Sequence, residues 1–225
     1  MRKPVVDYKN FKFSKITSPE YNHLLYLSGW ILYFILYTLT ELFIPSNKCF
    51  VVHHWLDDVI PFCEYFIVPY VLWYALIVVT LIYFALYNPK NFKKLQIFIT
   101  ATQIIAMFIY IVWPSRQDLR PTEFARDNFF TDVVGLLYTI DTNTNVFPSL
   151  HVGYSLAMMS VWCKEESAKW YAKLGVSIFC ILVCLSTAFV KQHSVLDGFA
   201  AFIMCAVIEV ILFKDYYKNL FKRKA

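Results

Sequence analysis

Long apolar stretches separated by short polar segments form the dominant pattern along this chain. Six stretches have the length and character of membrane-crossing helices: residues 24–44, 65–87, 97–113, 146–163, 170–190 and 194–213. A helix needs about 20 mostly apolar residues to cross roughly 30 Å of hydrocarbon. The pattern therefore predicts an all-α integral membrane protein with six transmembrane helices.

The polar segments complete this organisation. Residues 1–23 form a basic lead, residues 24–213 a six-span core and residues 214–225 a basic tail, and we expect them to make a single membrane-embedded domain. The lead is long and no small-residue cleavage site follows the first apolar stretch, so the first span should stay attached. An amphipathic segment at 122–138 predicts an interfacial helix in the loop between spans three and four.

Composition supports the membrane assignment. Hydrophobic residues make up 59% of the chain and charged residues only 16%, whereas an ordinary soluble domain carries roughly a quarter charged residues. The 21 Phe, 16 Tyr and 6 Trp suit the boundary between lipid and water. Nothing in the sequence indicates nucleic-acid binding, and we expect membrane lipids as partners.

The distribution of basic residues predicts the orientation. Most Lys and Arg residues lie in the lead, in the connections around residues 90–94 and 164–173, and in the tail. With six spans all four segments share one side, and basic residues concentrate on the cytoplasmic side. Both termini are therefore expected in the cytoplasm. The basic residues of the opposite side are Lys48, Arg116, Arg120, Arg126 and Lys191.

Chemically competent side chains gather on that opposite, outer side. They come from three segments, 114–121, 147–151 and 186–197. The candidate site residues in these segments are two histidines, a carboxylate, two hydroxyls and three cations: His151, His193, Asp197, Ser149, Ser186, Arg116, Arg120 and Lys191.

This set matches phosphoryl transfer through a covalent intermediate. A neutral imidazole can attack phosphorus, and a carboxylate four residues away on a helix can hold the proton on its other nitrogen. His193 and Asp197 have that spacing. His151 is the candidate general acid and base. The three cations would neutralise phosphoryl oxygens, and Ser149, near the N-terminus of the fourth span, adds a hydroxyl close to backbone amides that suit an anion.

The same three segments resemble the signatures of the type 2 phosphatidic acid phosphatase superfamily. The family pattern is Lys six residues before Arg-Pro, then Pro-Ser-Gly-His, then Ser-Arg with His and Asp following at fixed spacing. Here Arg120-Pro121, Pro148-Ser149-Leu150-His151 and Ser186-Thr187 with His193 and Asp197 take these places. The chain departs from the pattern at Trp113, Leu150 and Thr187, and Arg116 and Lys191 are the candidate replacements for the missing cations.

The resemblance implies a hydrolase: a lipid phosphatase that needs no metal and no cofactor and works through a phosphohistidine at His193. Its substrate would be phosphatidate, a prenyl diphosphate or a similar lipid phosphate. The alternative is a phosphotransferase of the same superfamily, similar to inositol phosphorylceramide or sphingomyelin synthases. The expected location is the plasma membrane, with the site on the extracytoplasmic or lumenal side.

Other interpretations of these residues stay open. His151 and His193 could instead be the axial ligands of a haem, and the chain could be a transporter or a lipid-binding protein without catalysis. A second polar cluster, His53, His54, Asp57 and Asp58, fits an interfacial segment better than a metal site. Cys49 and Cys63 could pair in an oxidising compartment. The sequence does not decide whether the chain forms a homo-oligomer.

Overall fold

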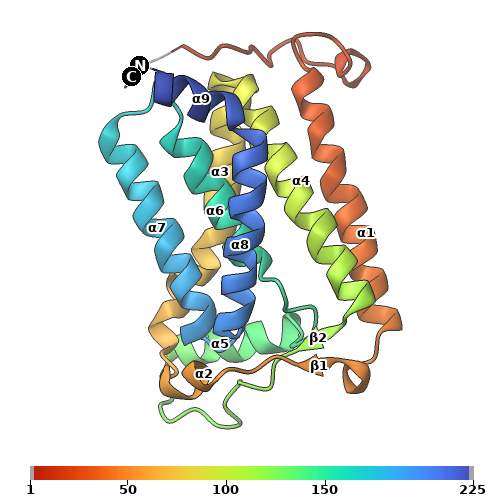
Figure 1. Ribbon diagram of the computed structural model, residues 1–225, viewed down its shortest axis with the longest axis vertical. Coiled ribbons are helices and arrows are strands. Elements are labelled where there is room, and N and C mark those ends of the chain that lie inside the picture. The colour runs from red at the N-terminus through yellow and green to blue at the C-terminus, as the bar shows by residue number, and fades with distance from the viewer. Residues whose placement is uncertain (1–2, 223–225) are drawn as a thin grey trace.

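A computed structural model describes residues 3–222 as a bundle of helices along one long axis (Figure 1). The bundle consists of α1 (Ser28–Phe43), α3 (Ile67–Tyr87), α4 (Pro89–Val112), α6 (Leu150–Cys163), α7 (Trp170–Phe189) and α8 (Val195–Leu212). In the described part of the chain, the strands are β1 (Phe50–Val51) and β2 (Ser115–Arg116), which pair in parallel. The expected all-α class is confirmed.

Five helical segments are long and apolar enough to cross a membrane. They are Asn22–Phe43, Glu64–Tyr87, Pro89–Val112, Trp170–Phe189 and Val195–Leu212. The first begins with the 3-10 turn η2 (Asn22–Leu27) and the second with η4 (Glu64–Phe66). The remaining bundle helix, α6, has 14 residues and packs against α4, α7 and α8. The several apolar helices agree with an integral membrane protein.

The start of α4 differs from the expectation. The sequence predicted a loop around residues 90–94 and a span from residue 97, but the helix begins at Pro89. Asn88 caps it by accepting a hydrogen bond from the Asn91 amide, and proline fits the first helical position because it lacks an amide hydrogen. The polar residues at 90–94 predicted a loop, but they form the first turns of α4, and the apolar part of the helix follows them.

Both described chain ends lie at the same end of the bundle, at the top of Figure 1. The lead contains η1 (Phe13–Lys15) and docks on α3, because the amides of Val5 and Val6 donate to the carbonyl of Leu86. The tail is not a simple extension of the chain but the helix α9 (Lys214–Lys222). Arg2, Arg223 and Lys224, which contributed to the charge argument, lie outside the described residues.

The opposite end of the bundle carries the connecting elements η3 (Ser46–Lys48), β1, α2 (Trp55–Val59), β2 and α5 (Phe129–Ile140). In Figure 1, α5 lies across the bundle end rather than along its axis. The expected helix at 122–138 is therefore present but shifted toward the C-terminus. It begins at residue 129 because the Asn128 side chain accepts hydrogen bonds from the amides of Phe130 and Thr131 and so caps the helix.

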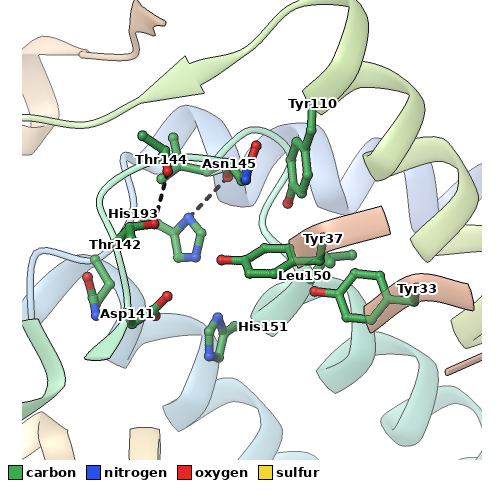
Figure 2. A pocket seen from close by; sticks show the side chains of 12 residues that line it. Tyr33, Tyr37, Tyr110, Asp141, Thr142, Thr144, Asn145, Leu150, His151 and His193 are labelled. Carbon is green, nitrogen blue, oxygen red and sulfur yellow. Dashed lines mark hydrogen bonds between the residues drawn. The ribbon is translucent and has the colours of Figure 1, made fainter. Parts of the chain in front are cut away.

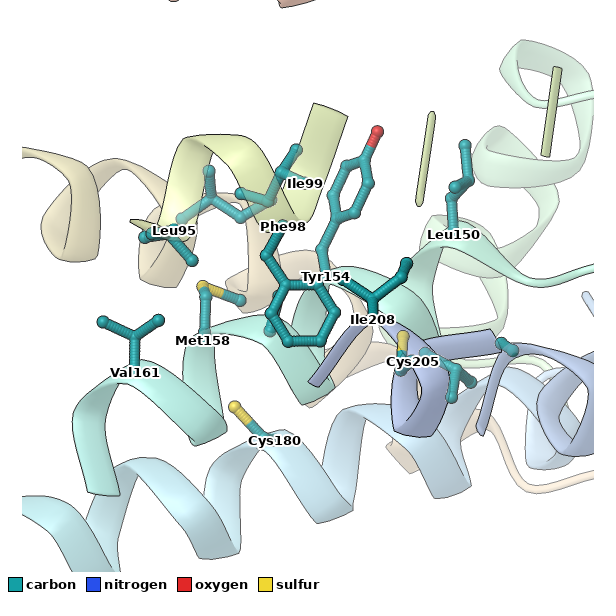
Figure 3. Close-up of a cluster of buried hydrophobic side chains, with 14 of the residues drawn as sticks. Leu95, Phe98, Ile99, Leu150, Tyr154, Met158, Val161, Cys180, Cys205 and Ile208 are labelled. Carbon is teal, nitrogen blue, oxygen red and sulfur yellow. The ribbon is translucent and has the colours of Figure 1, made fainter. Parts of the chain in front are cut away.

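The core lies between α4, α6, α7 and α8. Figure 3 shows side chains from all four helices in contact: Leu95, Phe98, Ile99, Tyr154, Met158, Val161, Cys180, Cys205 and Ile208. All six cysteines are free thiols, so Cys49 and Cys63 do not pair. A Cβ at Gly29 would lie 2.6 Å from Thr100 Oγ1, so this glycine allows α1 to approach α4 closely, as small residues do between membrane helices.

Large apolar side chains also cover the outside of the bundle. Examples are Ile31 and Phe34 on α1, Val79 on α3, and Phe199 and Phe202 on α8, all more than half exposed. A helix of a soluble bundle normally turns a polar face outward. Apolar faces on both the inside and the outside are what a helix surrounded by lipid requires.

Candidate active site

A small pocket opens near the bundle end that carries β1 and β2. Its volume is about 60 Å³, which suffices for a few water molecules. Figure 2 shows that side chains from α1, α4, α6 and two loops converge on it. The lining residues are Tyr33, Tyr37, Tyr110, Asp141, Thr142, Thr144, Asn145, Val146, Leu150, His151, Gln192 and His193.

The imidazole of His193 is held in one tautomer. Its Nδ1 lies 3.1 Å from the carbonyl oxygen of Val146 and 3.1 Å from Oδ2 of Asp197. A backbone carbonyl can only accept a hydrogen bond, so Nδ1 carries the proton. In the neutral imidazole the Nε2 atom therefore has the free lone pair, and none of the hydrogen bonds found among residues 3–222 involves it. This is the arrangement that a histidine nucleophile needs.

The contact between His193 and Asp197 is present, but its geometry differs from the one that the sequence predicted. His193 is not on the helix but one residue before Ser194, the N-cap of α8. Asp197 occupies the third helical position and turns back, so that its Oδ2 accepts from the Ser194 amide at 2.9 Å as well. Asp197 is fully buried, and its Oδ1 has no partner among the described residues.

His151 faces His193 across the pocket. Their ring centroids are 5.6 Å apart. The His151 ring also packs against Trp73 at 4.3 Å and Tyr70 at 4.5 Å, and its Nε2 is buried with no hydrogen-bond partner in the described part of the chain. An unpartnered buried nitrogen is costly unless a ligand or water completes it. The predicted catalytic residues His151, His193 and Asp197 are thus brought together.

Ser149 positions the start of α6. It is the N-cap, and its Oγ accepts from the Val152 amide at 3.4 Å. Its own amide donates to the carbonyl of Asp197 at 3.1 Å, which ties α6 to α8. The first amides of a helix lack intrahelical acceptors and carry partial positive charge. Leu150 and His151 at the pocket wall therefore present the positive end of α6 to it.

Arg120 lies behind the pocket wall rather than in it. Its guanidinium donates to the carbonyls of Tyr138, Asp141 and Thr142 and to Oε1 of Gln192. Burial lowers the pKa of Arg120. The side chain therefore fixes the loop after α5 against the loop before α8, and its charge reaches the pocket only through these neighbours.

The other predicted phosphate-binding side chains are engaged elsewhere. Lys191 Nζ donates to the carbonyls of Asp57 and Ile60, both at 2.6 Å, at the end of α2. Arg116 pairs with Asp118 at 3.2 Å and also donates to the carbonyl of Ser46. Ser186 Oγ donates to the carbonyl of Val183 within α7. Lys191, Arg116 and Ser186 do not line the pocket.

Several residues that line the pocket were not among the candidates predicted from the sequence. Asp141 ends α5 and accepts hydrogen bonds from Tyr70 Oη at 3.3 Å and Gln192 Nε2 at 3.4 Å. Burial raises the pKa of Asp141. Tyr33 and Tyr37 come from α1, where their four-residue spacing was the available signal that they share a helix face.

The segment 53–62 supports the site from behind. The buried carboxylate of Asp57 accepts hydrogen bonds from Ser194 Oγ at 2.6 Å and from the Val195 amide at 2.8 Å. His53 pairs instead with exposed Asp58 at 2.9 Å. Across residues 3–222, no group of three or more His, Cys, Asp and Glu is placed to hold a metal ion. The sequence predicted an interfacial position for this segment and gave no sign of its contact with the loop that carries His193.

A haem does not fit between His151 and His193. The aromatic rings of Tyr70 and Trp73 already occupy the space beside His151.

Comparison with known proteins returns no relative of this chain. No family model matches it, and neither a curated protein nor a solved structure is significantly similar to it. The resemblance to the phosphatase superfamily therefore rests on the motif residues alone.

Proposed function

We propose that this protein is a membrane enzyme that cleaves phosphate esters of lipids through a phosphohistidine at His193. The observation that carries the proposal is the fixed tautomer of His193, with Nδ1 held by Val146 and Asp197 and Nε2 free at the pocket. A carboxylate that fixes the histidine tautomer is the arrangement used in hydrolytic triads. Hydrolysis to a free phosphate is the first form of the reaction, which makes the enzyme a lipid phosphatase.

In the proposed reaction, Nε2 attacks phosphorus and the P–O bond to the leaving alcohol breaks. His151 starts in its protonated form, donates this proton to the leaving oxygen and becomes neutral. The phosphorylated imidazolium keeps its Nδ1 proton, and the carboxylate of Asp197 balances the positive charge. Water then loses a proton to His151 and attacks phosphorus, which breaks the P–N bond and restores neutral His193. The phosphoryl oxygens are held by the helix amides at Leu150 and His151, and no step needs a metal ion.

Transfer to a lipid or polyol hydroxyl is the alternative outcome for the same intermediate. The acceptor would replace water in the second step and would use the same base. The resemblance to synthases of the superfamily supports this alternative. The two outcomes differ in the product, which is free phosphate for hydrolysis and a new phosphodiester for transfer.

The proposed topology has six spans, with α6 as a short sixth span inside the bundle. The shared location of the chain ends in Figure 1 supports an even number of crossings. The lysines around α4 and α9 then lie in the cytoplasm, in agreement with the charge rule. The His193 pocket faces the extracytoplasmic or lumenal side of the plasma membrane, and α5 lies in the interface there.

The direct test is turnover by purified protein in detergent with no divalent metal added. Phosphatidate, a prenyl diphosphate and phosphatidylglycerol phosphate serve as substrates, with glycerol and a lipid alcohol as acceptors. His193→Ala should abolish turnover, because it removes the nitrogen that attacks phosphorus in the proposed reaction. His53→Ala is the matched control, since this exposed histidine pairs with exposed Asp58 and does not line the pocket. Full activity of His193→Ala would refute the proposal.

A further inference from the structure

The charge of the pocket wall is unusual for a phosphate site. Among the described residues, none of the lining side chains is Lys or Arg. The one carboxylate in the wall is Asp141, and the other polar groups are hydroxyls, amides and the imidazoles of His151 and His193. Sites for doubly charged phosphates normally use Arg or Lys, which bind the oxygens directly.

The nearest basic side chain, Arg120, does not add a positive charge to the pocket wall. The guanidinium of Arg120 donates to three backbone carbonyls and to Gln192, and the carboxylate of Asp141, which follows α5, offsets its positive charge. The groups left to stabilise an anion are the proton of His151, the start of α6 and the hydroxyls of Tyr33 and Tyr37, which point into the pocket (Figure 2). A helix N-terminus is equivalent to roughly half a positive charge.

From this charge balance we propose that the site takes phosphodiesters, which carry one negative charge, in preference to phosphate monoesters, which carry two. The inference rests on the proposed function and narrows its substrate class. The cost of moving an ion out of water rises with the square of its charge, and burial without a partner is expensive even for one charge. A second charge would also be repelled by Asp141 at short range.

The reaction with a phosphodiester follows the same steps with a different product. His193 Nε2 forms the P–N bond, and one of the two P–O ester bonds breaks. The released alcohol takes its proton from His151, and the other ester stays on the phosphoryl group. Attack by water or an alcohol then breaks the P–N bond, and His151 takes the proton of the attacking group. Free inorganic phosphate is not formed in one cycle.

The test compares two lipids that differ by one methyl group and one charge. Phosphatidate and phosphatidylmethanol with identical acyl chains are offered to the wild-type protein at pH 8, where a phosphate monoester is doubly charged. Diacylglycerol release is measured for both. We expect kcat/KM for phosphatidylmethanol to be higher by about tenfold or more, as expected for one extra charge near a carboxylate.

Asp141→Asn tests the cause of the selectivity. Removing this charge should raise kcat/KM for phosphatidate and narrow the ratio of the two lipids by about tenfold. Asp118→Asn is the matched control, because this exposed aspartate pairs with Arg116 outside the pocket, and it should leave the ratio unchanged. The wild-type comparison remains decisive if Asp141→Asn does not fold.

The outcomes separate this inference from the proposed function. His193-dependent turnover that favours phosphatidylmethanol supports both. His193-dependent turnover that favours phosphatidate, or a ratio that Asp141→Asn leaves unchanged, overturns the phosphodiester inference and leaves the proposed function in place. Turnover that does not need His193 overturns both.

Discussion

The interaction of His193 with Asp197 shows what single residues contribute to this site. Asp197 holds the Nδ1 proton of His193 and caps the start of α8 with the same oxygen. One carboxylate therefore sets both the tautomer of the proposed nucleophile and the geometry of the helix that follows it. Its burial removes competing water, which strengthens both hydrogen bonds.

We expect Asp197→Asn to reduce turnover by about 10³–10⁴-fold, as the corresponding change does in a hydrolytic triad. Asparagine can still accept from the Ser194 amide, but its amide group can favour the wrong tautomer of His193. The measurement is kcat in the assay of the His193 variant, with circular dichroism to show that the helices are retained. Asp215→Asn on exposed α9 is the control. Near-normal kcat for Asp197→Asn would contradict the orienting role.

At the level of residues, the sequence predicted the histidines and Asp197 but not the cations. His193 and Asp197 are four positions apart, so a local contact was expected and is present. Arg120, Arg116 and Lys191 have long side chains whose partners are backbone carbonyls from distant segments. Which carbonyls lie within reach depends on tertiary packing, so their positions did not follow from the sequence.

The short helix α2 shows how one element fixes another. Its residue Asp57 accepts from the first residues of α8, and its terminal carbonyls accept from Lys191. The segment between Lys191 and Val195, which carries His193, is therefore held at both ends by α2. Burial lowers the pKa of Lys191, and the carbonyls together with nearby Asp57 and Asp58 act against that shift.

Asp57→Ala should lower the free energy of unfolding by about 2 kcal/mol or more, because Ser194 Oγ and the Val195 amide lose their acceptor in a buried place. Thermal unfolding in detergent measures this change, and kcat should fall as well. Asp58→Ala is the neighbouring control: it breaks an exposed pair with His53, which is worth about 1 kcal/mol or less. Equal effects of the two changes would argue against the proposed support.

At the level of elements, the long apolar stretches of the sequence predicted every helix of the bundle. The differences from the structure lie in the residues where helices begin. Helix α4 starts earlier because Asn88 and Pro89 form a cap, and α5 starts later because Asn128 does. Caps depend on one or two polar residues, whereas the apolar pattern averages over many. The role of α2 was missed because its apolar and acidic residues fit an interfacial segment equally well.

The described chain ends lie at one end of the molecule (Figure 1). The His193 pocket lies toward the other end, where the loops after α5 and before α8 line it. This polarity agrees with the charge distribution along the sequence. The number of spans depends on α6, because a bundle with five crossings would put the chain ends on opposite sides of the membrane.

Labelling of single cysteines tests this topology. Lys12→Cys, Asp118→Cys and Asp215→Cys are introduced separately into a chain whose native cysteines are replaced by serine. A membrane-impermeant maleimide applied to intact cells should label only position 118, and permeabilised cells should be labelled at all three. Labelling of position 12 or 215 in intact cells would contradict the six-span arrangement. All three positions are exposed, so a buried thiol would not explain a negative result.

The length of α6 has a consequence for how a lipid meets the enzyme. Its 14 residues rise by about 21 Å, less than the roughly 30 Å of a hydrocarbon layer. His151 at its first turn would therefore sit below the level of the surrounding head groups. The irregular backbone that precedes α6 would lie at a similar depth, where it is stable only when protein or water surrounds it. A bound lipid would keep its tails in the leaflet and sink by part of its own length, and the bilayer would thin locally to meet the histidines.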